Sequence, residues 1–130
     1  MRSIRQLDTQ ECLNNLVGIP YSKLDCWELV KKFYEEVFNI DMSVYNEDCR
    51  DTLNPAETSR YMEMHKLDFL KVEKPDFGDI LLLKVQGLNA HLGVFLGNGT
   101  FIHTTDKTGS VIEKVSRWKY RLEGYYKWQY

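Results

Sequence analysis

The spacing of apolar side chains changes once along the chain, from a helical period to a strand period. Ahead of Pro75, apolar positions recur every three or four residues, as on one face of a helix. From Pro75 onward they fall in short runs rich in Val, Ile, Leu, Phe and Tyr, separated by Gly, Asn, Asp and Ser. Helices grouped ahead of strands predict an α+β fold, with N-terminal helices packed on a C-terminal antiparallel β-sheet.

Three helices are predicted in the first part of the chain. Asp8 and Glu11 have the spacing of a capping box, so the first helix is expected to begin at Asp8 and to stop at Gly18. The second is expected over residues 25–38, and the third from Asn54-Pro55, because Pro suits the first helical position. Their apolar stripes are Cys12, Leu13, Leu16 and Val17; Trp27, Val30, Phe33, Tyr34, Val37 and Phe38; and Tyr61, Met64, Leu67 and Phe69.

Five strands are predicted in the second part, and the short turns between them indicate an antiparallel meander. Alternation places Tyr126, Trp128 and Tyr130 on one face of the last strand, where packing is their expected use. Repeats, low-complexity stretches and linkers are not evident in the sequence, so a single domain over residues 1–130 is expected. The predicted strands are Ile80–Val85, Ala90–Leu96, Thr100–Thr105, Val111–Val115 and Gly124–Tyr130.

The turn Gly97-Asn98-Gly99 sets the register of one predicted hairpin. A three-residue loop makes Leu96 face Thr100, and the same register sets Gly93 opposite His103. His91 then lies on the same face as His103, as its diagonal neighbour. A two-residue turn at Asn98-Gly99 would shift the register by one residue and send the two imidazole rings to opposite faces.

Composition excludes several classes of protein. The chain has 130 residues, 43% of them hydrophobic and 28% charged, which is typical of one globular domain rather than a disordered, collagenous or coiled-coil chain. A net charge of -2 argues against nucleic acid as a partner. The longest apolar run, Ile80–Leu83, is too short to span a membrane, and Met1–Leu13 lacks the apolar core of a signal peptide. Neither a membrane partner nor a signal peptide is therefore expected.

Of the three cysteines, one has a physical reason to be reactive. An odd number without CxxC spacing fits neither a disulfide framework nor a zinc knuckle, and indicates synthesis in a reducing compartment. Cys12 lies in an apolar stripe, and Cys49 lies in an acidic loop that disfavours a thiolate. Cys26 is expected in the first turn of a helix, where the dipole favours the thiolate and backbone amides can hold an oxyanion. Cys26 is therefore the candidate nucleophile.

The two facing histidines allow three interpretations: a metal site, a structural pair or part of a catalytic site. A metal needs a third and usually a fourth ligand, and Cys26 would supply only one, so no metal or other cofactor is predicted. His65, on a presumed helix, is given only a structural role. His91 and His103 become catalytic candidates because a candidate nucleophile accompanies them.

Four segments of the chain, taken in order, form a recognisable pattern: Gly18-Ile19-Pro20-Tyr21, Asp25-Cys26-Trp27 opening a helix, Phe77-Gly78-Asp79-Ile80 opening a strand, and the stretch from His91 through the Gly-Asn-Gly turn to His103. They resemble the NlpC/P60 family of papain-like cysteine peptidases, and the last segment is the most specific. The stretch from Asp25 to Ile40 and the Tyr125-Tyr126 ending resemble the branch of this family found in phage tail-assembly and tail-tip proteins. The resemblance covers about residues 18–105.

The resemblance implies a role for each matched residue. Cys26 would be the nucleophile, His91 the general base, and His103 the group that orients the His91 ring. Tyr21 would help the Cys26 amide to stabilise the oxyanion. The family cleaves peptide bonds in peptidoglycan stem peptides without a metal, so the implied substrate is a stem peptide. The tail branch implies synthesis in the bacterial cytoplasm, phage tail proteins as partners, and action in the virion at the host cell wall.

Two departures from the family pattern keep other hypotheses open. Only residues 22–25 separate Tyr21 from Cys26, where the family has a longer Gly-rich loop, and Glu28 stands where a small residue is common. Both favour an inactive structural tail protein with the same fold. A cysteine acyltransferase or amidase acting on a substrate outside the cell wall would use the same three side chains.

Overall fold

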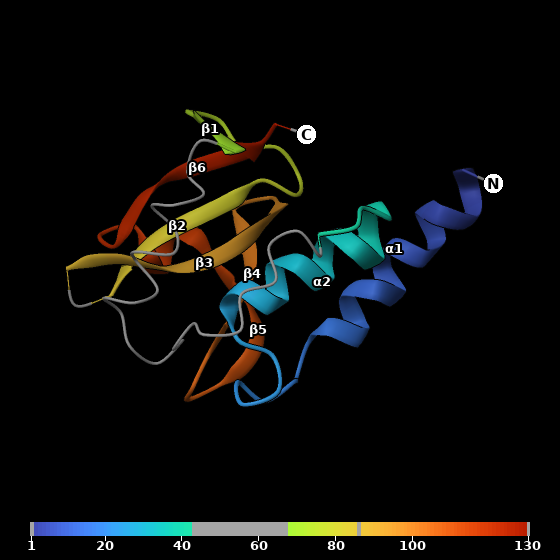
Figure 1. The fold of residues 1–130 in the computed structure, drawn as a ribbon, viewed down its shortest axis with the longest axis horizontal. Coiled ribbons are helices and arrows are strands. Elements are labelled where there is room, and N and C mark those ends of the chain that lie inside the picture. The colour runs from blue at the N-terminus through green and yellow to red at the C-terminus, as the bar shows by residue number, and fades with distance from the viewer. Residues whose placement is uncertain (1, 43–67, 86, 130) are drawn as a thin grey trace.

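One helix lies against an antiparallel sheet, and a second helix packs on the first, in the computed structural model, which describes residues 2–42, 68–85 and 87–129 (Figure 1). The sheet has six strands in the order β1-β6-β2-β3-β4-β5. Every neighbouring pair is antiparallel, which confirms the predicted α+β fold. The predicted meander holds only for β2 to β5, because the last strand crosses over to lie between β1 and β2. The elements are α1 (Arg2–Leu16), α2 (Cys26–Phe38), β1 (Phe69–Val72), β2 (Ile80–Val85), β3 (Leu88–Gly97), β4 (Thr100–Thr105), β5 (Gly109–Lys114), the 3-10 turn η3 (Val115–Trp118) and β6 (Leu122–Trp128).

Helix α2 begins at a complete capping box. The Asp25 carboxylate accepts a hydrogen bond from the Glu28 backbone N–H at 2.9 Å, and the Glu28 carboxylate accepts one from the Asp25 N–H at 3.0 Å. Two amides that the helix itself leaves without partners are thus satisfied. At the other end Asn39 adopts the left-handed conformation, with φ 59°, and closes the helix. The predicted span of this helix is confirmed.

Helix α1 begins at Arg2, so the predicted start at Asp8 is wrong. The capping-box spacing of Asp8 and Glu11 lies inside the helix, because the preceding residues continue its backbone instead of turning away. The predicted end is correct: the helix stops at Leu16, and Gly18 takes a φ of +86°. The Cys12 thiol donates to the Glu36 carbonyl at 3.4 Å, which ties α1 to α2 and gives this cysteine a structural contact.

The predicted third helix lies mostly outside the described residues, and its last apolar position is wrong. Phe69 begins β1 instead, where it faces Trp128 of β6. Four residues are too few to show a strand period in the sequence, so this edge strand depends on the partner that β6 supplies. The far end of the stripe, Tyr61 to Leu67, is among the residues that the structure does not describe.

The β3–β4 hairpin differs from its prediction at the turn but not at the histidines. Gly97, not Leu96, faces Thr100, so the connection is a two-residue turn at Asn98-Gly99. Both turn residues have positive φ, 53° and 72°, as this tight turn requires. The register shifts between Phe95 and Gly97, and this bulge absorbs the extra residue before the slip can reach the rest of the hairpin.

The sheet has a buried cluster on each face. One contains the apolar side of α2 with the even-numbered positions of β3 and β4, such as Leu92, Val94 and Ile102. The opposite one contains Leu81, Leu83, Phe101 and Val115, with Trp118 packed against it. No described helix is long and apolar enough to cross a membrane.

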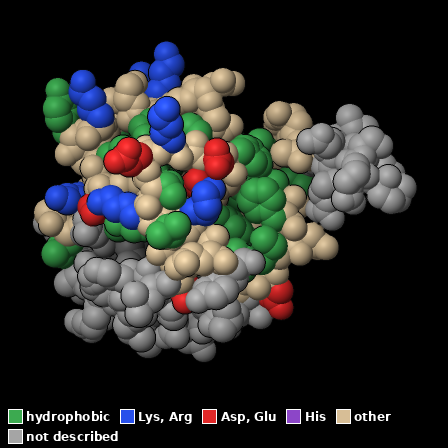
Figure 2. All heavy atoms as spheres, turned by 90° about the horizontal axis from the view of Figure 1, so that it is seen from above, with side chains coloured by type: hydrophobic (Ala, Val, Ile, Leu, Met, Phe, Trp, Pro, Cys, Tyr) green, Lys and Arg blue, Asp and Glu red, His purple; other side chains and the backbone are tan. Residues whose placement is uncertain are grey.

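Charges of both signs meet on the β1–β6 side of the sheet. Seen from above in Figure 2, basic and acidic side chains lie among apolar ones. Lys71 pairs with Glu123 at 3.1 Å, and Lys127 pairs with the buried Asp79 at 3.1 Å. Asp79 also accepts the Asp76 N–H at 2.8 Å, so its carboxylate stabilises the turn that leads into β2.

Candidate active site

The structure brings the two predicted histidines into direct contact. Nε2 of His91 lies 2.8 Å from Nδ1 of His103, and both rings are buried. Gly93 faces His103 across the hairpin, as predicted. The observed bulge is what keeps the two rings on one face despite the two-residue turn.

Gly93 serves the pair by admitting a neighbouring ring. A Cβ at this position would stand 2.5 Å from Cδ2 of Phe101, closer than real Cβ contacts come. Phe101 is fully buried and stacks on His103, with ring centroids 4.5 Å apart at 27°. The room that the glycine leaves is therefore filled by Phe101, which supports one face of the His103 ring.

Two further residues, Glu113 and Trp118, complete the polar cluster, and sequence reasoning missed both. Nε2 of His103 lies 3.3 Å from Oε1 of Glu113, and the Trp118 indole N–H donates to the same oxygen at 2.6 Å. Trp118 also stacks near His91, with ring centroids 5.7 Å apart at 28°. A signal for Glu113 existed in the register, because Val111 faces His103 and Glu113 lies two positions along β5.

Burial keeps both rings neutral at pH 7. It lowers the pKa of His91 to about 3, with smaller contributions from the neighbouring His103 and from Arg121. Burial also lowers the pKa of His103, although the Glu113 carboxylate opposes that shift. For Glu113, burial raises the pKa, but the hydrogen bonds from Trp118 and His103, together with electrostatic attraction to His103 and Arg117, lower the pKa overall. The cluster therefore holds two neutral imidazoles against one carboxylate.

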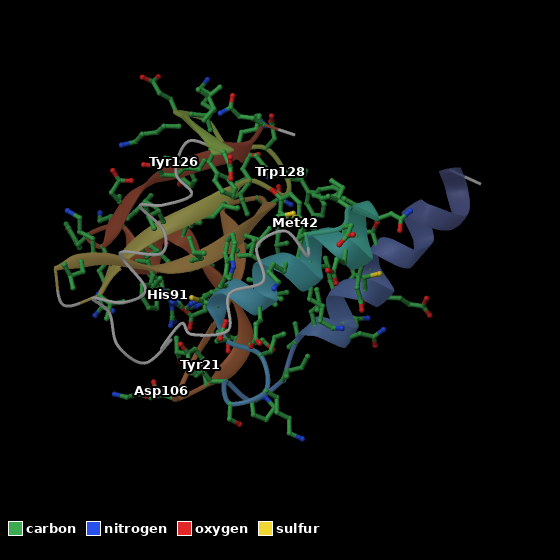
Figure 3. The ribbon with its side chains drawn as sticks, in the orientation of Figure 1. Tyr21, Met42, His91, Asp106, Tyr126 and Trp128 are labelled. Atoms are coloured by element: carbon green, nitrogen blue, oxygen red, sulfur yellow. The ribbon has the colours of Figure 1, made fainter. Side chains whose placement is uncertain are left out.

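Cys26 is the first residue of α2 and is buried, with 2% of its surface exposed. It belongs to the buried cluster on the α2 face of the sheet, which includes Leu92 and Val94. His91 and His103 lie at odd-numbered positions, on the sheet face of Phe101 and Trp118. In the projection of Figure 3, His91 lies toward the end of α2 at which the helix begins. The close approach of the Cys26 sulfur to the His91 ring stays a prediction.

The segment ahead of Cys26 is attached to β5. The Gly18 N–H donates to the Ser110 carbonyl at 2.8 Å, and the Ser110 N–H donates to the Ile19 carbonyl at 2.9 Å. A turn follows, in which the Leu24 N–H donates to the Tyr21 carbonyl at 3.2 Å. Tyr21, half-buried and labelled in Figure 3, stands in this turn, and its role at an oxyanion stays a prediction. These bonds position the start of α2 relative to the strands that carry the histidines.

Glu28 has an observed structural role. Its carboxylate accepts the Asp25 N–H in the capping box, so it is engaged at the helix terminus. Of the other residues considered from sequence, Cys49 and His65 lie outside the described residues. Within the described ranges, no three His, Cys, Asp or Glu side chains gather as metal ligands would.

A model of the NlpC/P60 family matches residues 15–127. The chain belongs to the NlpC/P60 family. Among curated proteins it is similar to "Murein DD-endopeptidase MepS/Murein LD-carboxypeptidase" of Escherichia coli strain K12, with 24% identity over 110 residues. That match covers 82% of this chain and 50% of the relative, so the chain spans about half the length of the curated relative.

Solved NlpC/P60 structures share the fold. A lipoprotein-like NLP/P60 family protein of Staphylococcus aureus has a TM-score of 0.64 at 15% identity, over 94% of this chain and 40% of that chain. The NlpC/P60 domain of the peptidoglycan hydrolase SagA has a TM-score of 0.59 at 16% identity, over 95% of this chain and 97% of that chain. The predicted family is thus confirmed, whereas membership of the phage tail branch stays a prediction.

Proposed function

We propose that the chain is a cysteine peptidase that hydrolyses peptide bonds in peptidoglycan stem peptides. The hydrogen bond between His91 and His103 carries the proposal, because it joins a candidate base to a candidate orienting group in a buried site. Family membership supports it, since the matched relatives include a protein named as a murein endopeptidase and one named as a peptidoglycan hydrolase.

The geometry of the histidine pair suggests which atom acts as the base. Nε2 of His91 is engaged by His103, so Nδ1 is the nitrogen that would take the proton from the Cys26 thiol. Burial keeps the His91 ring neutral, which is the form that accepts a proton. The same burial lowers its pKa to about 3 and so weakens it as a base. His103 would hold that ring in one orientation through the cycle.

The reaction then proceeds in two halves. The Cys26 thiolate adds to the scissile carbonyl, and the oxyanion is held by the Cys26 amide and the Tyr21 hydroxyl. The C–N bond breaks as the imidazolium of His91 returns its proton to the leaving amine, and a thioester remains on Cys26. Water, deprotonated by His91, adds to the thioester, which releases the carboxylate product and the free thiol.

Replacement of Cys26 by Ala tests the proposal directly. We expect purified sacculi treated with the wild-type protein to release new free amines and shortened stem peptides, and the Cys26→Ala variant to release none. Cys12→Ala is the matched control, because Cys12 makes a structural contact with Glu36 and should leave turnover intact. Equal release by the wild-type protein and by Cys26→Ala would remove Cys26 from the mechanism.

We further propose that the protein acts as part of a phage tail during entry through the host cell wall. The support is the likeness of the segment from Asp25 to Ile40 to the tail branch of the family. In a phage lysate that contains the tagged protein, it should sediment with tail particles in a density gradient. Recovery in the free protein fraction alone would contradict this location while leaving the peptidase proposal standing.

The alternatives predict different chemistry at Cys26. An inactive tail protein has no need of an activated thiol, whereas the peptidase should react with iodoacetamide rapidly and stoichiometrically at neutral pH. Glu28 was one of the two features that favoured an inactive protein. This argument is weaker because the Glu28 carboxylate accepts a hydrogen bond in the helix cap. An acyltransferase or amidase would turn over a lipid-ester substrate in preference to a stem peptide, so the two substrates should be assayed side by side.

A further inference from the structure

The bond between the two histidines can run in either direction, and only one direction suits a base at His91. If His91 donates from Nε2, its Nδ1 is unprotonated and can accept a proton. If His103 donates from Nδ1 instead, a neutral His91 carries its own proton on Nδ1 and cannot act as a base there. The distance of 2.8 Å fits both directions equally. A group outside the pair must therefore choose between them.

We propose that Glu113, held by Trp118, is a positioning residue that sets the tautomers of His103 and His91. The inference rests on the proposed function of this site and adds to it a residue pair that acts through the imidazoles. A carboxylate only accepts, so Oε1 of Glu113 requires the proton of His103 on Nε2. Neutral His103 then has a bare Nδ1, which must accept from Nε2 of His91. This series of hydrogen bonds leaves Nδ1 of His91 unprotonated.

The Trp118 indole further constrains the Glu113 oxygen to act as a hydrogen-bond acceptor. An indole N–H only donates, so the Glu113 oxygen at 2.6 Å from it must be an acceptor. The same Oε1 atom meets Nε2 of His103, at 3.3 Å. Trp118 comes from η3 and Glu113 from β5, so two separate elements fix the oxygen in place. The Trp118 ring also lies against His91, which limits the tilt of the ring that it helps to orient.

Because the His103 ring is buried, its hydrogen-bond partners determine its tautomer. The His103 side chain is 1% exposed and that of Glu113 is 26% exposed, so solvent reaches the carboxylate end of the chain but not its middle. A buried ring nitrogen has no water to bond in place of its partner. Among the described residues, the charged or titratable groups that act electrostatically on this series of hydrogen bonds include His91 from β3, Arg117 near Glu113 and Arg121 near His91.

The negative charge of Glu113 has a second effect, on the proton transfer itself. When Cys26 gives its proton to His91, positive charge appears on the imidazole pair, and a carboxylate at the far end stabilises it. This favours the thiolate at lower pH. Removal of the charge should therefore move the pH profile of Cys26 alkylation to higher pH.

Two substitutions at Glu113 separate hydrogen bonding from charge. Glu113→Gln keeps an acceptor oxygen for Trp118 and His103 without the charge, and Glu113→Ala removes both. Glu123→Gln is the matched control, because Glu123 also accepts hydrogen bonds, from Tyr126 and Lys71, but belongs to the β1–β6 side of the sheet. The readouts are ¹⁵N NMR of the imidazole nitrogens, the pH profile of iodoacetamide alkylation, and kcat/KM on stem peptides.

In the wild-type protein we expect both rings to carry their proton on Nε2. Glu113→Gln should keep these tautomers and shift the alkylation profile to higher pH. Glu113→Ala should mix the tautomers and lower kcat/KM by about 10- to 100-fold, the range found when a group that orients a metal-bound imidazole through its second nitrogen is lost. Glu123→Gln should change none of the three readouts.

Unchanged tautomers and an unchanged alkylation profile in Glu113→Ala would overturn the inference. The NMR and alkylation readouts need no substrate, so they test Glu113 even if the wild-type protein fails to cleave stem peptides. In that case the proposed function is wrong, and the NMR and alkylation results still decide whether Glu113 sets the tautomers. If Glu113→Ala does not fold, the ¹⁵N spectrum of the wild-type protein still decides, because a proton on Nδ1 of either ring would contradict the inferred tautomers. Glu113→Gln then tests the effect of the charge alone.

Discussion

Replacement of Gly93 by Ala should disturb the histidine pair through a single added methyl group. The new Cβ would stand 2.5 and 2.9 Å from two carbons of the Phe101 ring and 3.2 Å from the Ile102 carbonyl oxygen. Phe101 is fully buried, so its ring cannot swing into solvent to relieve the contact. It must instead press on His103, which stacks on it at 4.5 Å.

The expected cost follows from what overpacking does in a full core. Extra methyl groups of this kind destabilise proteins by about 1–3 kcal/mol. Restricting the unfolded chain by a Gly-to-Ala change returns about 0.4–1 kcal/mol, so a net loss of up to about 2.6 kcal/mol remains, with a central value of about 1.3 kcal/mol. In a domain of this size the central value lowers the melting temperature by roughly 4–7 °C.

Urea denaturation followed by circular dichroism measures the loss, and imidazole NMR reports on the rings. The matched control is Gly124→Ala, because its added Cβ would meet Cε of Lys71, near the end of a flexible side chain that can move away. We expect the control to differ from the wild-type protein by less than about 0.5 kcal/mol. If Gly93→Ala is as stable as the control and its His91 and His103 resonances are unmoved, the packing argument is wrong.

Two further predictions concern the helix cap and pH. Asp25→Ala should lower the free energy of unfolding by about 1 kcal/mol because the Glu28 amide loses its acceptor, and urea titration should show Glu28→Gln, which keeps an acceptor oxygen, closer to the wild-type protein. The pKa of His91 is about 3 in the folded protein, against 6.5 for an imidazole in water, so the unfolded chain binds a proton more readily below pH 6.5. Stability should therefore fall as the pH is lowered from about 6.5 toward 3, and the fall should be shallower in His91→Gln; parallel curves for both proteins in pH-dependent calorimetry would contradict this assignment.

The second helix illustrates what local sequence can predict. Its start needs only Asp25 and Glu28 at the right spacing, and its end needs only a residue such as Asn39 that tolerates a left-handed conformation. All of these signals lie within a few residues of the feature they determine. The first helix shows the limit, because the same spacing at Asp8 falls in the middle of a helix.

The geometry of the histidine pair was predicted correctly from local sequence, but the turn that leads to it was not. Its geometry was predictable because strand alternation and one turn relate His91 to His103 over a short stretch of chain. The prediction of the turn itself was wrong, and the pair survives because a bulge between Phe95 and Gly97 corrects the register. A bulge depends on how a strand packs against its neighbours, so the residues of the turn alone do not reveal it.

Short-range patterns in the chain suffice for the fold class, for the capped helix that begins at Cys26, and for two imidazoles on one face of a hairpin, because each depends on local periodicity or on a single turn. The register of β5 on β4 could have placed Glu113 on the histidine face, but only the packed fold reveals that its carboxylate bonds both His103 and Trp118, and that β1 pairs with β6. These contacts run between elements that are far apart in the chain or joined by a change of direction. Their side chains come into contact only after β3, β4, β5 and η3 have packed. Periodicity in the sequence predicts the face on which a side chain lies, but not which carboxylate oxygen contacts which imidazole ring.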